Sequence, residues 1–170
     1  MNTTLDDNIL ALKQGEMLLC NLSNSAYTTP ALPVFASTIG AHIRHNLDHY
    51  ACFLDGLCGG FIDYSARKRN SQIEQNRAFA LAEFSRILDQ LAALDLREKK
   101  WCVLIDPETG PRQTQTSIQR ELEFLLSHTI HHYAMVAVIC KLGGLEVDED
   151  FGVAPSTLRY RAAQATACAS

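Results

Sequence analysis

The sequence predicts an all-α protein, a four-helix bundle with a small β-hairpin-like insertion between the third and fourth helices. Apolar residues recur every three or four positions over four long segments, which is helical spacing. Strands and helices do not alternate along the chain, which argues against a βαβ fold. The 170 residues are enough for one core, so we expect a single bundle domain over residues 1–170.

The first helix is predicted from its apolar spacing and its cap. Residues 5–22 carry apolar side chains at helical spacing, and Thr3 and Thr4 precede them as candidate N-terminal caps. The helix is predicted to end before Thr28. The proline-containing stretch at residues 30–33 restricts the backbone, so we interpret it as a linker.

The second and third helices are predicted in the same way. The second starts at Ser37 or Thr38 and runs to about Leu57, where the glycines at 59–60 end it. Residues 71–94 repeat apolar side chains on a spacing that strands cannot use, and they are predicted to form one continuous third helix.

Residues 100–118 change character. Residues 101–105 are β-prone, residues 106–110 contain a proline and a glycine typical of a turn, and residues 113–117 alternate polar and β-branched side chains. This pattern predicts a small hairpin that crosses between the third and fourth helices.

The fourth helix is the longest. It is predicted to begin near Thr116 or Ser117 and to end at Leu142, before two glycines. At about 25 residues it would be ~37 Å long. Residues 145–170 then form a C-terminal tail that we expect to pack on or near the bundle, with a short helix starting at Pro155.

Charge and hydropathy exclude several partners. The net charge is −4, and the one dense basic stretch, at residues 67–69, is interpreted as a solvated loop, so we expect no nucleic-acid partner. The longest apolar run, residues 133–140, is too short to span a membrane, and residues 1–7 lack a secretory signal. We therefore expect a cytoplasmic protein whose cysteines are reduced thiols.

The six histidines fall into two groups, and this distribution carries the functional prediction. His128 and His132 lie four residues apart, so they share one face of the fourth helix with Cβ atoms ~5–6 Å apart. That spacing suits two imidazoles on one divalent ion. His131 points in another direction and is the poorer ligand.

The second group supplies a third nitrogen if its face turns inward. His42, His45 and His49 lie within about 60° of one another on the second helix. Spacing alone does not choose between His45 and His49, and it also leaves open two ions held by two histidine pairs.

Five further residues lie near these motifs. Glu121 could serve as a base, or as a first-turn carboxylate that stabilises the helix start. Cys52 could be a thiol near the metal or a small core residue, and Asp48 could orient an imidazole or lie in solvent. Arg44 and Arg120 could hold an anionic group or be surface charges.

These motifs resemble the DinB/YfiT-like family of metal-dependent four-helix bundle proteins. The resemblance rests on an H-x-x-D motif in the second helix (His45 to Asp48), an H-x-x-x-H motif in a later helix (His128 to His132) and a β-like insertion between the two. It covers about residues 5–142. One histidine of the second helix and two of the fourth bind a divalent metal in that family, which implies His45, His128 and His132 here.

The resemblance implies a metal-dependent hydrolase or a thiol-dependent S-transferase that acts on a small-molecule substrate, with a low-molecular-weight thiol among the partners, and a homodimer. Three imidazoles leave a coordination position open, at which water or a thiol is activated. His49 and Glu121 are the candidate catalytic residues. The donor set does not choose among zinc, nickel, iron and manganese. The alternatives are a non-catalytic metal-binding bundle that acts as a structural, sensor or interaction module, and a metal-free bundle.

Overall fold

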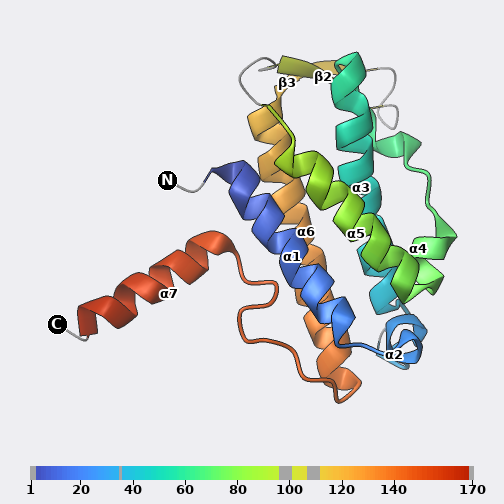
Figure 1. The fold of residues 1–170 in the computed structure, drawn as a ribbon, viewed down its shortest axis with the longest axis vertical. Coiled ribbons are helices and arrows are strands. Elements are labelled where there is room, and N and C mark those ends of the chain that lie inside the picture. Colours follow the sequence, from blue (N-terminus) through green and yellow to red (C-terminus); the bar gives the residue numbers. More distant parts are fainter. Residues whose placement is uncertain (1–2, 35, 96–100, 107–111, 169–170) are drawn as a thin grey trace.

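A computed structural model of the protein describes residues 3–34, 36–95, 101–106 and 112–168. Four long helices form a bundle, and a small sheet lies at one end of it (Figure 1). The first and second long helices in chain order each pack against the third and the fourth. The predicted fold class is therefore confirmed. The long helices are α1 (Thr4–Cys20), α3 (Ile39–Gly59), α5 (Arg77–Ala92) and α6 (Ile118–Leu142).

The first helix begins as predicted but ends earlier. The Thr3 hydroxyl accepts a hydrogen bond from the N–H of Asp6, and the Asp6 carboxylate accepts one from the N–H of Thr3. The chain leaves the helix after Cys20 and forms a separate short helix, α2 (Asn24–Thr28). The prediction of one helix that ends just before Thr28 was wrong here, because the Ser23 side chain caps a new helix start.

Both ends of α3 follow their predicted signals. The Thr38 side chain accepts a hydrogen bond from the N–H of Ala41, which caps the N-terminus. Gly60 ends the helix with a φ of 75°, a left-handed conformation that favours glycine. The histidine-bearing helix is therefore held in a fixed register at both ends.

The predicted third helix is broken in two. A short helix, α4 (Ser71–Gln75), ends at Asn76, whose backbone leaves helical geometry with φ −132° and ψ 105°. The Asn76 side chain then accepts a hydrogen bond from the N–H of Phe79 and caps α5. The prediction of one helix over residues 71–94 missed this break, because apolar spacing continues across it while the asparagine competes for the backbone.

The predicted hairpin is confirmed, and a further strand joins it. Strands β2 (Trp101–Asp106) and β3 (Arg112–Ser117) pair antiparallel, while the predicted turn falls largely on residues 107–111, outside the described residues. A two-residue strand, β1 (Phe61–Ile62), pairs parallel with β2. A single 3₁₀ turn, η1 (Tyr64–Ala66), follows β1 and packs near α3. Two residues are too few to show a strand period, so the sequence did not indicate β1.

The bundle core contains a polar connection among three helices. The Tyr50 hydroxyl on α3 donates to Oδ1 of Asn8 on α1 at 2.6 Å and accepts from the Thr129 hydroxyl on α6 at 3.3 Å. All three side chains are buried. Since these hydrogen bonds are directional, they fix the relative heights of α1, α3 and α6.

Beyond α6, the chain returns along the bundle and then leaves it. The ring of Phe151 stacks on that of Tyr133 with centroids 4.7 Å apart, and both side chains are buried. Helix α7 (Pro155–Cys168) then extends away from the bundle (Figure 1). Arg159 of this helix pairs with Asp7 of α1 at 3.1 Å. In the described part of the chain, no helix has the length and apolarity needed to cross a membrane.

Candidate metal centre

Five histidines from two antiparallel helices meet within the bundle. His42, His45 and His49 lie along one face of α3, and His128 and His132 lie one turn apart on α6. The ring centroids of His45, His128 and His132 are 4.6 to 4.9 Å from one another. The ring of His49 lies 4.4 Å from those of both His45 and His128. The three residues predicted to bind the metal are therefore brought together, with His49 beside them.

The ring nitrogens divide into two overlapping sets. His45, His49 and His128 each offer a nitrogen, and these three nitrogens lie within 4.8 Å of one another. His132 lies beside His42, with their Nδ1 atoms 2.8 Å apart, so one of these atoms donates and the other accepts. Among the described residues, nitrogen distances therefore favour His49 as the third ligand, whereas the predicted ligand His132 is near His45 and His128 by ring position.

Hydrogen bonding decides which nitrogens have an available lone pair. Nδ1 of His49 lies 2.7 Å from the carbonyl oxygen of His45, which can only accept, so this Nδ1 carries the proton. The lone pair of His49 is therefore on Nε2, and Nη1 of Arg67 lies 3.3 Å from it. Nε2 of His128 is buried and has no hydrogen-bond partner among the described residues, so this nitrogen fits a metal ligand.

Burial keeps these imidazoles neutral. Together with the charges of the neighbouring histidines and Arg67, it lowers the pKa of His45 to about 3. Burial is also the main cause that lowers the pKa of His132 to about 3. It lowers the pKa of His49 to about 4, although the hydrogen bond to the backbone of His45 raises this pKa. The pKa values of His42 and His128 are also lowered, mainly by burial. Neutral imidazole is the form that binds metal, so the cluster is in its ligating state at neutral pH.

Glu121 is buried near the cluster but bonds to hydroxyl groups. Its carboxylate accepts from the Tyr64 hydroxyl at 2.9 Å and from the Thr116 hydroxyl at 2.7 Å. The Tyr64 ring lies 5.4 Å from the His49 ring, so Tyr64 stands between Glu121 and the histidines. Glu121 is also in the first turn of α6, where a carboxylate stabilises the helix start.

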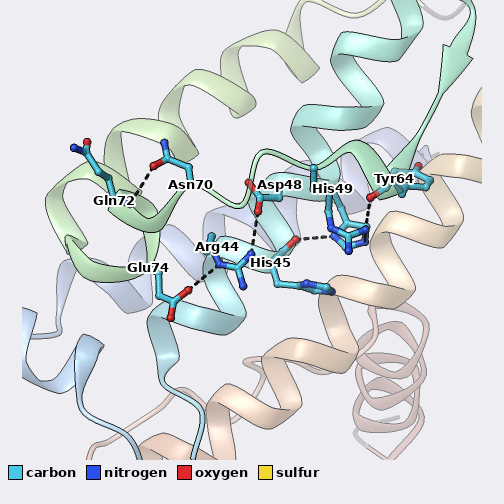
Figure 2. Close-up of polar contacts among 9 residues, drawn as sticks. Arg44, His45, Asp48, His49, Tyr64, Asn70, Gln72 and Glu74 are labelled. Carbon is cyan, nitrogen blue, oxygen red and sulfur yellow. Dashed lines mark hydrogen bonds and ion pairs between the residues drawn. The ribbon is translucent and has the colours of Figure 1, made fainter. Parts of the chain in front are cut away.

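Arg44 and Asp48 form an ion-paired group beside the histidines, as Figure 2 shows. Arg44 binds Asp48 at 3.1 Å and Glu74 at 2.9 Å. Asp48 is buried, which excludes the prediction that its carboxylate lies in solvent. Because Arg44 already binds two carboxylates, it joins α3 to α4 and is not available as an anion-binding residue.

Cys52 and the two other arginines have different surroundings. Cys52 is half-buried and lines a cavity of about 280 Å³ together with Asp48 and Asp63, and burial raises the pKa of its thiol. Arg120 is mostly exposed, with its guanidinium 5.8 Å from the centroid of the Phe124 ring. Arg67 is half-buried against His49, although the sequence had indicated a solvated loop. No periodicity marks this loop, so its pattern did not indicate Arg67 as a site residue.

Comparison with solved structures identifies the bundle. YfiT from Bacillus subtilis superposes with a TM-score of 0.56, and the match covers 84% of this chain and 89% of that one. The chain has the YfiT fold. YfiT is described as a probable metal-dependent hydrolase with an unusual four-helix bundle topology. The two sequences are 17% identical, so the likeness to YfiT shows the fold alone.

Sequence comparisons add less to this YfiT-like bundle. No family model matches the chain. A stretch of 104 residues is 33% identical to FK506-binding protein 5 of Rhizopus delemar, and the match covers 58% of this chain. It covers 27% of the Rhizopus protein, so the chain spans about a quarter of the length of that relative.

Proposed function

We propose that the protein is a metal-dependent hydrolase that acts on a small-molecule substrate and holds one divalent ion through His45, His128 and His132. The observation that carries this proposal is the group of neutral, inward-facing imidazoles, in which Nε2 of His128 is buried without a partner. The description of YfiT, which has the same fold, favours hydrolysis over thiol transfer.

The donor set fits a divalent transition-metal ion. Imidazole nitrogen suits zinc, nickel and iron, and also binds manganese, so the residues do not select among these ions. His132 is proposed as the third ligand in the tautomer in which its Nδ1 donates to His42, because this hydrogen bond would fix the ring and leave the lone pair of Nε2 for a metal. His49 is the alternative, since its nitrogen lies close to those of His45 and His128, but its lone pair faces Arg67.

Bound to three imidazoles, a divalent ion supplies an open position and lowers the pKa of a bound water toward neutrality. The chain itself would hold the ligand rings in place and keep them neutral. His49, fixed by the carbonyl of His45, remains the candidate residue for handling a proton next to the ion. Glu121, fixed by two hydroxyl groups, remains a candidate that would act through the Tyr64 hydroxyl.

Metal content tests the ligand assignment. Untagged wild-type protein is expected to contain about one ion per chain, and His128→Ala/His132→Ala is expected to contain almost none, because two of three ligands are lost. His131→Ala is the matched control, since His131 is exposed on the same helix. Equal metal content in the double variant and the wild type would overturn the site. Loss of metal in His49→Ala but not in His132→Ala would assign His49 as the third ligand, and two ions per chain would indicate paired sites.

Two further measurements separate hydrolase from the alternatives. Azide added to the cobalt-substituted protein is expected to change its visible spectrum, because an open position exchanges ligands. An unchanged spectrum would indicate a closed structural site.

Turnover of an ester or amide without added thiol identifies a hydrolase, whereas turnover that requires a low-molecular-weight thiol identifies an S-transferase. The homodimer and the cytoplasmic location remain predictions.

A further inference from the structure

Arg67 is a charged residue at the histidine cluster that the proposed metal centre does not use. It follows η1 in the loop between β1 and α4, and its side chain is half-buried. Its Nη1 donates to the carbonyl oxygen of Tyr64 and lies 3.3 Å from Nε2 of His49. The guanidinium is therefore held against the ring of a histidine that lies 4.4 Å from both His45 and His128.

Among the described residues, no carboxylate pairs with this guanidinium. The acidic side chains nearby bind other groups: Asp48 binds Arg44 at 3.1 Å, and Asp63 accepts from the Ser65 hydroxyl at 2.6 Å. Nε of Arg67 is buried and has no hydrogen-bond partner. A partly buried cation with an unused donor is unfavourable unless an anion is supplied, so the geometry favours an external counterion.

Two neighbours of Arg67 in this loop, Ala66 and Lys68, line a cavity of about 280 Å³. The positive charge of Arg67 lowers the pKa values of His45, His49 and His128. Burial raises the pKa values of Cys52 and Asp48, which line this cavity, and the charge of Arg67 opposes that rise. An anionic group bound by Arg67 would lie beside His49, whose Nε2 is 3.3 Å from Nη1 of Arg67.

We propose that Arg67 is a substrate-binding residue that takes a carboxylate group, so that the substrate of the hydrolase is a small carboxylic acid. The proposal rests on the proposed metal centre, beside which the carboxylate would anchor the substrate. The planar guanidinium fork matches the geometry of a carboxylate. A single positive charge balances a monoanion, and the buried carboxylate of Asp48, on which the charge of Arg67 also acts, disfavours a more highly charged group such as phosphate.

The test is a titration of the full chain, labelled with ¹⁵N in its histidines, with acetate at fixed pH in zinc-loaded and chelator-treated forms. Acetate is expected to shift the ring resonances of His49 saturably, and neutral acetamide is expected to leave them unchanged. Arg67→Gln is expected to weaken acetate binding about tenfold or more, the size of a lost charged hydrogen bond. Arg69→Gln removes the same charge from an exposed residue of the same loop and is expected to bind acetate like the wild type.

Several outcomes would overturn the proposal. They are equal acetate affinity in wild type and Arg67→Gln, equal shifts with acetamide and acetate, and tighter Arg67-dependent binding of inorganic phosphate than of acetate. If Arg67→Gln does not fold by circular dichroism, Arg67→Lys replaces it. This variant keeps the charge but loses the fork, so acetate should bind several-fold more weakly, and unchanged affinity would contradict the assignment.

The same samples separate this proposal from the proposed function. Elemental analysis is expected to find equal metal content in wild type and Arg67→Gln, because Arg67 is not a ligand. If the wild type binds no metal, the hydrolase proposal fails. The acetate titration of the chelator-treated chain then still decides whether Arg67 binds a carboxylate.

Discussion

The hydroxyl of Tyr50 joins three helices within the core, and its loss should be measurable. We predict that Tyr50→Phe lowers the free energy of unfolding by about 1–3 kcal/mol, since Asn8 and Thr129 lose a buried hydrogen-bond partner. Urea denaturation followed by circular dichroism measures the change. Tyr160→Phe is the control, because Tyr160 is 65% exposed on α7. Equal stability of the two variants would show that this buried connection contributes nothing.

Single residues also show how far the sequence predicts the site. The meeting of His45 with His128 and of His42 with His132 follows from helical spacing on two antiparallel helices, so the histidine groups could be recognised from their positions. Arg67 could not be found, because a loop residue has no period and its position depends on how the chain turns after β1. The choice between His49 and His132 depends on hydrogen bonds that spacing does not encode.

At the scale of elements, the close packing of α4 on α3 depends on Gly40. A Cβ atom at this position would overlap the backbone carbonyl oxygen of Glu74 and approach the Tyr27 ring to 2.9 Å. We predict that Gly40→Ala lowers the free energy of unfolding by about 1–3 kcal/mol, because the backbone of α4 has to move. Thermal or urea unfolding measures this effect.

Gly59→Ala is the matched control for this change, since it lies on the same helix and its Cβ would meet no atom within 4 Å. It is expected to leave stability unchanged or to raise it by up to about 1 kcal/mol. If Gly40→Ala were as stable as Gly59→Ala, the contact between α3 and α4 would not be tight in solution.

Element boundaries were predictable where caps are strong and unpredictable where side chains compete. The start of α6 after Ser117 and the end of α3 at Gly60 follow from cap residues that the sequence displays. The break at Asn76 and the pairing of β1 with β2 do not, since the first depends on one side chain capping α5 and the second on a contact between distant segments.

For the whole molecule, the buried histidines predict acid sensitivity of the metal-free protein. Burial lowers the pKa of His45 and His132 to about 3 and that of His49 to about 4, from an ordinary value of 6.5. Between the folded-state pKa values and 6.5, these histidines bind more protons in the unfolded chain than in the folded one. The stability that they contribute is therefore full above pH ~6.5 and is lost as the pH falls. Urea denaturation in chelator at several pH values should show this decline.

His49→Gln provides the comparison for that experiment, because it removes one of the titrating groups. The decline in unfolding free energy between about pH 6.5 and 4 should be shallower in this variant than in the wild type. Identical slopes would mean that His49 is not protonated more readily in the unfolded chain than in the folded one.

The division of the site between helices and loop affects how such a protein can diversify. The imidazoles are borne by α3 and α6, whose heights are fixed by the buried contacts of Tyr50, whereas Arg67 belongs to the loop between β1 and α4. Loops accept substitutions and insertions that packed helices reject. A change in this loop would therefore alter the charge that faces the histidines while it leaves the imidazoles of α3 and α6 in place.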